Sequence, residues 1–174
     1  MLRTAGILAG LLTLATPLLG QDRMAVDLEL VLAVDVSRSM DFDELSLQRE
    51  GYAKALEHPA VTSAFGMGRL GRSARMYFEW GGPGNTRVLV DWTVMSGPGD
   101  AHAAAAQLRA APIGGLRGTS ISGAMETAAA WIEGNRFDGT RRVVDISGDG
   151  PNNRGRPVTE VRAELAAKGI EVNG

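Results

Sequence analysis

The fold is decided by residues 28–41, LELVLAVDVSRSMD, in which an apolar run ends in alternating polar side chains. A short apolar run that stops at a polar turn predicts a fully buried strand over 28–34. Alternate side chains of an extended segment point the same way, so we expect Asp35, Ser37 and Ser39 to face one point. A carboxylate and two hydroxyls at the tip of a buried strand indicate a binding site there.

Outward from this strand, helical and extended segments alternate along the chain. Asp41 or Asp43 is predicted to cap the first helix, and Asp100 to cap an alanine-rich second helix. Core spacing and end signals place the helices at about 43–58, 100–111, 121–133 and 157–168, with further strands at 142–147 and from 170. This alternation predicts an α/β fold with a doubly wound, Rossmann-like, mostly parallel sheet.

One antiparallel edge strand is expected within this sheet. The segments SARMYFEW (73–80) and TRVLVDW (86–92) flank the turn sequence GGPGN, which is typical of a hairpin. On the second segment, Val88, Val90 and Trp92 alternate and are predicted to share one face of the strand.

Composition excludes several classes of protein. The 174 residues suggest one domain, and a net charge of −2 gives no reason to expect nucleic acid or an anionic membrane as a partner. The chain has no cysteine, which excludes a disulfide framework, thiolate metal sites and a cysteine nucleophile.

The N-terminal segment, residues 1–20, has the layout of a secretory signal peptide: Arg3, an uncharged apolar stretch, then small and turn-forming residues. We predict cleavage after Gly20 and an exported protein, periplasmic or secreted. The alternative is an uncleaved N-terminal anchor, which would be the chain's one contact with a membrane.

A second acidic residue is expected at the same place as Asp35. Asp149 follows another predicted strand, and ligands of such sheets bind beyond the carboxyl ends of the strands. Carboxylate and hydroxyl oxygens suit a hard divalent cation, Mg²⁺ or Mn²⁺. Two carboxylates neutralise that ion, which leaves it able to bind an acidic group of a partner protein.

The motif DVSRS resembles the D-x-S-x-S motif of von Willebrand factor type A (vWA) domains. GTS, with Thr119, and SGDG, with Asp149, are similar to the second and third elements of the metal-ion-dependent adhesion site of that family. The resemblance implies that Ser37, Ser39 and Thr119 coordinate Mg²⁺ by hydroxyl. It also implies that Asp35 and Asp149 bind the ion directly or through water.

The resemblance covers residues 27–174, predicted as one vWA-like domain. The family's final strand and helices have no counterpart, so we expect the domain to be incomplete at its C-terminal end. The run GDGPNNRGRPVT looks like that of a bacterial group of exported vWA-like proteins of unknown function.

The main alternative is a metal-dependent phosphohydrolase of haloacid-dehalogenase type, because GDGPNN also resembles an element of that family. That chemistry needs a second acid where Ser37 stands, and a lysine ahead of the acidic loop. A purely structural metal is a third possibility. We favour a binding module without catalytic residues.

Some nearby side chains have two possible roles. Arg154 and Arg156 either steer an acidic partner or belong to a solvated loop. Asn152 and Asn153 either orient water on the metal or make the turn. Asp145, in the middle of a strand, needs a partner if it is buried.

Overall fold

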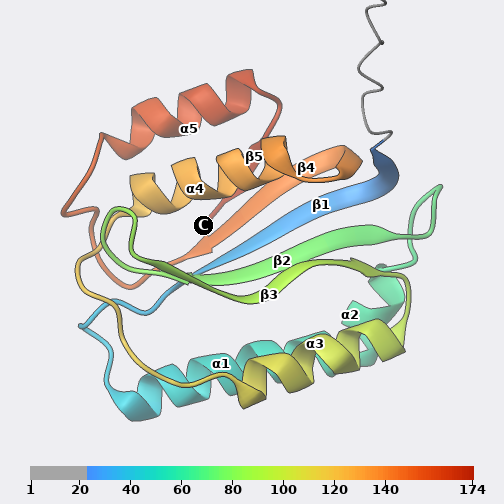
Figure 1. Cartoon of the computed structure of the whole chain (residues 1–174), viewed down its shortest axis with the longest axis horizontal. Helices are drawn as coiled ribbons and strands as arrows, with labels where there is room; N and C mark the ends of the chain where they lie inside the picture. The colour runs from blue at the N-terminus through green and yellow to red at the C-terminus, as the bar shows by residue number, and fades with distance from the viewer. Residues whose placement is uncertain (1–22) are drawn as a thin grey trace, which may run out of the picture.

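The structure, a computed structural model, describes residues 23–174 as a five-stranded sheet between two layers of helices (Figure 1). The strand order is β3-β2-β1-β4-β5. The strands are β1 (Met24–Asp35), β2 (Ser73–Trp80), β3 (Thr86–Met95), β4 (Phe137–Ser147) and β5 (Glu171–Asn173).

Both faces of the sheet carry helices, as Figure 1 shows. One face is covered by α1 (Phe42–Glu57), α2 (Pro59–Ala64) and α3 (Pro98–Ala110), and the other by α4 (Ile121–Gly134) and α5 (Val158–Ala167). Strand β1 pairs in parallel with β2 and β4, β4 pairs in parallel with β5, and β3 runs antiparallel to β2. The predicted doubly wound sheet with an antiparallel edge strand is confirmed.

The central strand β1 is buried on both faces, which explains its apolar sequence. Val31 and Ala33 pack into the core cluster on the side of α4 and α5, whereas Val34 packs into the cluster that includes α3. The strand ends at Asp35, at the carboxyl edge of the sheet. Loops from β1, β2 and β4 meet at this edge (Figure 1).

Helix α1 begins where the sequence predicts. Asp41 is its N-cap and accepts a hydrogen bond from the Glu44 amide at 2.9 Å, while the Glu44 carboxylate accepts from the Asp41 amide at 2.9 Å. This reciprocal capping box fixes the direction in which the chain leaves the Ser39 loop. The helix ends at Glu57, and Pro59 opens α2, which the sequence analysis did not predict.

The predicted cap of the second long helix is wrong. Gly97 is the N-cap of α3 and Pro98 its first residue, so Asp100 lies inside the first turn. The Asp100 carboxylate accepts hydrogen bonds from the amide and hydroxyl of Ser96, at 2.9 and 3.1 Å. A proline at the first helical position needs no amide partner, which allows the helix to start earlier.

The predicted common face of Val88, Val90 and Trp92 is also wrong. The β2–β3 pairing shifts register on both sides of Tyr77. Val90 consequently packs into the cluster that includes α3, whereas Trp92 packs against the cluster on the α4 side. A bulge adds a residue to one strand, which turns the following side chains to the opposite face.

The predicted signal peptide, residues 1–20, lies outside the described residues. Within residues 23–174, no helix is both long and apolar enough to cross a membrane.

Candidate metal centre

A chain of hydrogen bonds connects four of the five predicted ligands at the carboxyl edge. Asp35 Oδ1 accepts from the Ser37 amide at 2.7 Å, and the hydroxyls of Ser37 and Ser39 lie 3.0 Å apart. The Ser39 hydroxyl donates to Asp149 Oδ1 at 3.3 Å. The structure therefore brings Asp35, Ser37, Ser39 and Asp149 together from two loops. Asp35 and Ser37 are buried, whereas Ser39 and Asp149 are exposed at the mouth of the site.

The other oxygen of Asp35 has no partner among the described residues. The residue is 1% exposed, and Oδ2 is buried without a hydrogen bond. Burial raises the pKa of the Asp35 carboxyl above its usual value, and the charge of Asp149 also raises it. The hydrogen bonds from Ser37 lower this pKa, but by less than burial raises it. A buried carboxylate oxygen without a donor is costly, and a bound cation would remove that cost.

Thr119 reaches the same edge on the loop between α3 and α4. The Leu116 amide donates to the Val36 carbonyl at 2.7 Å, and Leu116 pairs with Ser37 in an isolated parallel bridge. Thr119 is 8% exposed. No hydrogen bond joins its hydroxyl to the other four predicted ligands within residues 23–174, so backbone contacts hold it at this edge.

The loop of Thr119 is also bonded to the loop of Asp149. Asn153 bonds to the backbone of Thr119 in both directions, and Asn152 Oδ1 accepts from the amide and hydroxyl of Ser122, at 3.3 and 3.4 Å. The Ser120 hydroxyl donates to the Arg154 carbonyl at 2.9 Å. Both asparagines thus hold the two loops together.

Gly148 leaves open the space beside the unpartnered oxygen. A Cβ atom at this position would lie 3.2 Å from Asp35 Oδ2 and 3.4 Å from the Trp80 ring. The absence of a side chain at 148 thus keeps room next to the carboxylate. Room, an unpartnered anionic oxygen and neighbouring hydroxyls together fit a small divalent cation.

The predicted metal ligands at this edge all offer oxygen atoms. Across residues 23–174, no three His, Cys, Asp or Glu side chains gather where they could hold a metal. The chain's two lysines lie elsewhere: Lys168 pairs with Glu133 at 3.0 Å, and Lys54 lies 3.9 Å from Glu50 on α1. The lysine that a haloacid-dehalogenase-type phosphatase requires is therefore not supplied by either residue.

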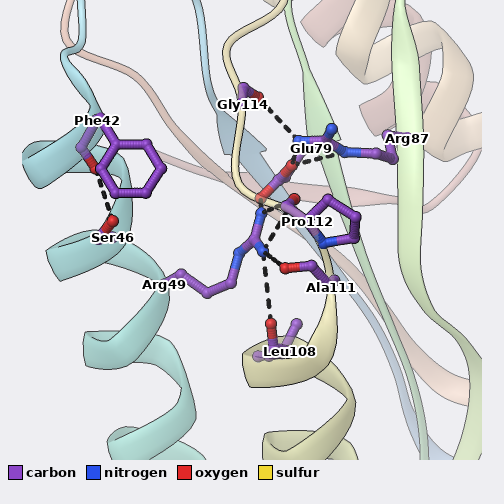
Figure 2. Close-up of polar contacts among 9 residues, drawn as sticks. All are labelled: Phe42, Ser46, Arg49, Glu79, Arg87, Leu108, Ala111, Pro112 and Gly114. Carbon is purple, nitrogen blue, oxygen red and sulfur yellow. Dashed lines mark hydrogen bonds and ion pairs between the residues drawn. The ribbon is translucent and has the colours of Figure 1, made fainter.

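A buried ion-pair network that was not predicted from the sequence anchors the segment leading to Thr119. Figure 2 shows Arg49 of α1 and Arg87 of β3 converging on Glu79 of β2, which is 1% exposed. Arg49 also donates to the carbonyls of Ala111 and Pro112, at 2.6 and 3.2 Å.

The same network also binds Gly114, which is closer to Thr119 in the sequence. Arg87 Nη2 donates to the Gly114 carbonyl at 2.8 Å (Figure 2). A glutamate within the aromatic strand segment 73–80 was the available signal, because a buried carboxylate requires a partner. The partners lie on other elements, and the sequence does not indicate which ones.

The structure also distinguishes the residues whose roles were open. Arg156 forms ion pairs with Glu126, Glu160 and Glu164 of α4 and α5. Arg154 makes no ion pair or side-chain hydrogen bond within residues 23–174. Asp145 is half-buried, and its charge raises the pKa of nearby Tyr52, which burial raises more strongly.

A family model described as "protein of unknown function (DUF1194)" matches residues 25–174. The chain belongs to this family. No curated protein sequence matches the chain.

Solved structures show that this DUF1194 member has the vWA fold. Proximal thread matrix protein 1 from the mussel byssus, in a structure with a zinc-occupied MIDAS motif, is similar with a TM-score of 0.64 and 17% identity. BatB from Bacteroides thetaiotaomicron has a TM-score of 0.57 and 20% identity, and the SpRpn10 VWA domain has 0.56 and 12%.

The matches cover 86%, 83% and 84% of the present chain, in the same order. The matched region spans 38% of the mussel protein, 64% of BatB and 73% of the SpRpn10 domain. At these identities the likeness establishes the fold, and the predicted vWA resemblance is confirmed at that level.

Proposed function

We propose that this chain is an exported binding module that holds Mg²⁺ or Mn²⁺ and captures an acidic group of a partner protein. The proposed ligands are Asp35, Ser37, Ser39, Thr119 and Asp149. The observation that carries the proposal is the buried Oδ2 atom of Asp35, which has no hydrogen-bond partner in the described chain. It faces the space left by Gly148, beside two hydroxyls and a second carboxylate.

The charges of this donor set favour an additional acidic ligand. Asp35 and Asp149 together balance a divalent cation, and serine and threonine hydroxyls add no charge. When bound, the cation would supply an electrophilic centre for an oxygen of the partner. Ser39 and Asp149 are exposed and Asp35 and Ser37 are buried, so a partner approaches from the solvent side.

Two further observations support a binding role. The mussel protein with the same fold has zinc in its MIDAS motif, which supports a divalent cation at this place in the fold. Both histidines of the chain lie elsewhere: His58 Nδ1 accepts from the Ala60 amide at the start of α2, and His102 is exposed on α3. Neither is placed to act as a general base at the site.

Mn²⁺ binding to the purified chain, measured by titration calorimetry, tests the metal site. We expect one ion per chain, with binding abolished by Asp35→Ala. Asp138→Ala is the matched control, because Asp138 is exposed near the opposite end of β4. Equal binding by the Asp35 variant, or no binding by the unaltered chain, would show that the proposed site does not exist.

A glycine–serine peptide whose only charged side chain is one central aspartate tests capture of an acidic group. We expect fluorescence anisotropy to show binding in Mg²⁺, no binding after EDTA, and no binding when the aspartate is replaced by asparagine. Cation binding without peptide binding would leave a structural metal and contradict the proposed capture.

A further inference from the structure

Exposed arginines without a partner gather at the carboxyl edge of the sheet. Within residues 23–174, the arginines that form no ion pair, no side-chain hydrogen bond and no stacking contact with a ring are Arg38, Arg69, Arg117, Arg154 and Arg162. Arg38, Arg117 and Arg154 each lie on a loop that supplies a proposed metal ligand. We call these residues the edge arginines.

Each edge arginine is close in sequence to a proposed ligand. Arg38 stands between Ser37 and Ser39, Arg117 precedes Thr119 in the next loop, and Arg154 follows Asp149 in the third. Figure 1 shows the three loops at the same edge of the sheet. The edge arginines are therefore carried by the same three loops that supply the proposed ligands.

Packing places two of these side chains against the Thr119 loop. A Cβ atom on Gly118 would lie 3.3 Å from both Cδ and Nε of Arg154. A Cβ atom on Gly115 would lie 3.9 Å from Cγ of Arg38. Glycines at these positions let the arginine side chains lie along the loop, close to Thr119.

No carboxylate in the described range 23–174 forms an ion pair with an edge arginine. Arg156, on the same loop as Arg154, pairs with glutamates of α4 and α5, which shows that such partners are within reach of a neighbour. Asp41 and Glu44 of the nearby helix are engaged in its capping box. Asp43 is the remaining acid in that first turn.

The edge arginines place three positive charges at this edge of a chain whose net charge is −2. A bound divalent cation would balance Asp35 and Asp149 and leave the edge arginines uncompensated. Such a local field attracts an oppositely charged partner and sets its orientation.

We propose that the partner presents a protein segment with several carboxylates a few residues apart. This proposal rests on the proposed function: one carboxylate binds at the metal, and flanking carboxylates pair with Arg38, Arg117 and Arg154. A guanidinium binds carboxylates well because its donors form a planar fork. Nucleic acid is disfavoured as the partner. Its phosphates are bound by an extended basic surface, whereas this chain has a net negative charge and only three edge arginines at the site.

Two labelled peptides separate the arginine contribution from the metal contribution. The first is the glycine–serine peptide with one aspartate, and the second has glutamates added on both sides of that aspartate. Binding is measured by fluorescence anisotropy in Mg²⁺ for the unaltered chain and for R38Q/R117Q/R154Q. The control R23Q/R69Q/R136Q makes the same change of charge next to the strands' opposite ends.

We expect the edge-arginine variant to bind the multi-acidic peptide about tenfold more weakly, since each solvent-exposed pair is worth about a factor of two to three. Its affinity for the single-aspartate peptide and for Mn²⁺ should stay within about twofold of the unaltered chain, since rim charges act on the flanking acids. The control variant should bind both peptides as the unaltered chain does.

Several outcomes would overturn the proposal. The edge-arginine variant binding the multi-acidic peptide at full strength would show that the arginines are not used. Displacement of that peptide by oligothymidylate at equal charge would point to nucleic acid instead. If neither peptide binds the unaltered chain in a Mg²⁺-dependent way, the proposed function itself fails. If the single-aspartate peptide binds in Mg²⁺ but the added glutamates do not increase the affinity, only the proposed role of the edge arginines fails.

Discussion

Asn153 holds Thr119 through a pair of hydrogen bonds: its amide donates to the Thr119 carbonyl at 3.1 Å, and its Oδ1 accepts from the Thr119 amide at 3.2 Å. These bonds join the loop of Asp149 to a loop that comes 34 positions earlier in the sequence. The position of the proposed threonine ligand is therefore set by the loop that supplies the second carboxylate.

Replacing Asn153 with alanine should weaken Mn²⁺ binding about fivefold, because the loss of one hydrogen bond of about 1 kcal/mol frees the Thr119 loop to move. Titration calorimetry measures the affinity. Asn173→Ala, at the exposed end of β5, is the control and should leave the affinity unchanged. Unaltered binding by Asn153→Ala would show that the side-chain bond of Asn153 has no part in placing the ligand.

Gly148→Ala should reduce cation binding with little loss of stability. The added Cβ would lie 3.2 Å from Asp35 Oδ2 and narrow the space beside it. Gly150→Ala is a control from the same loop, because a Cβ there meets nothing within 4 Å. Mn²⁺ titration and thermal unfolding should show a selective effect at 148, and equal affinities of the two variants would contradict it.

Asp35→Asn should have opposite effects on thermal stability with and without metal. The asparagine Oδ1 can still accept from the Ser37 amide, while removal of the buried charge should stabilise the metal-free chain by about 1 kcal/mol. With Mg²⁺ at about 100 times its Kd, the unaltered chain should gain about 2.7 kcal/mol and the variant nothing.

Thermal melts in EDTA and in saturating Mg²⁺ measure this reversal. A variant that melts below the unaltered chain in EDTA would show that the lone Oδ2 atom carries no penalty. A variant that gains as much from Mg²⁺ would place the cation elsewhere.

Glu79→Ala should destabilise the fold by about 3–5 kcal/mol, because it leaves the buried Arg49 guanidinium without its carboxylate. Urea unfolding measures the loss. Glu171→Ala is the control: it breaks the pair between Arg141 and Glu171, whose side chains are 61% and 53% exposed, and should cost less than about 1 kcal/mol. Similar costs for the two variants would show that the buried network is not a structural anchor.

Local sequence signals were sufficient for the frame of the molecule. The apolar run before Asp35 predicted the central strand, and Asp41 with Glu44 three positions later is a capping pair that acts within one turn of helix. The hairpin at 73–92 was also predicted from its turn residues. Each of these features depends on neighbours a few positions away.

Features that depend on distant residues were not predictable in the same way. The bulges that turn Val90 and Trp92 to opposite faces arise from pairing with β2. Arg49 and Glu79 are 30 positions apart, and nothing local to either residue identifies the other. For the candidate site, the sequence analysis placed Asp35, Ser37, Ser39 and Asp149 at one edge, where hydrogen bonds now connect them. It did not indicate that Asn153 bonds to the Thr119 backbone.

The order of strands in the sheet has a consequence for when the site can assemble during biogenesis. Ser39 and Asp149 are 110 positions apart and meet only when β4 has docked beside β1. A chain that is still being synthesised, or that crosses a membrane unfolded, has the carboxylates of Asp35 and Asp149 but no pocket between them. Capture of the proposed cation would therefore be a late event that reports a finished fold, in the compartment where the protein folds.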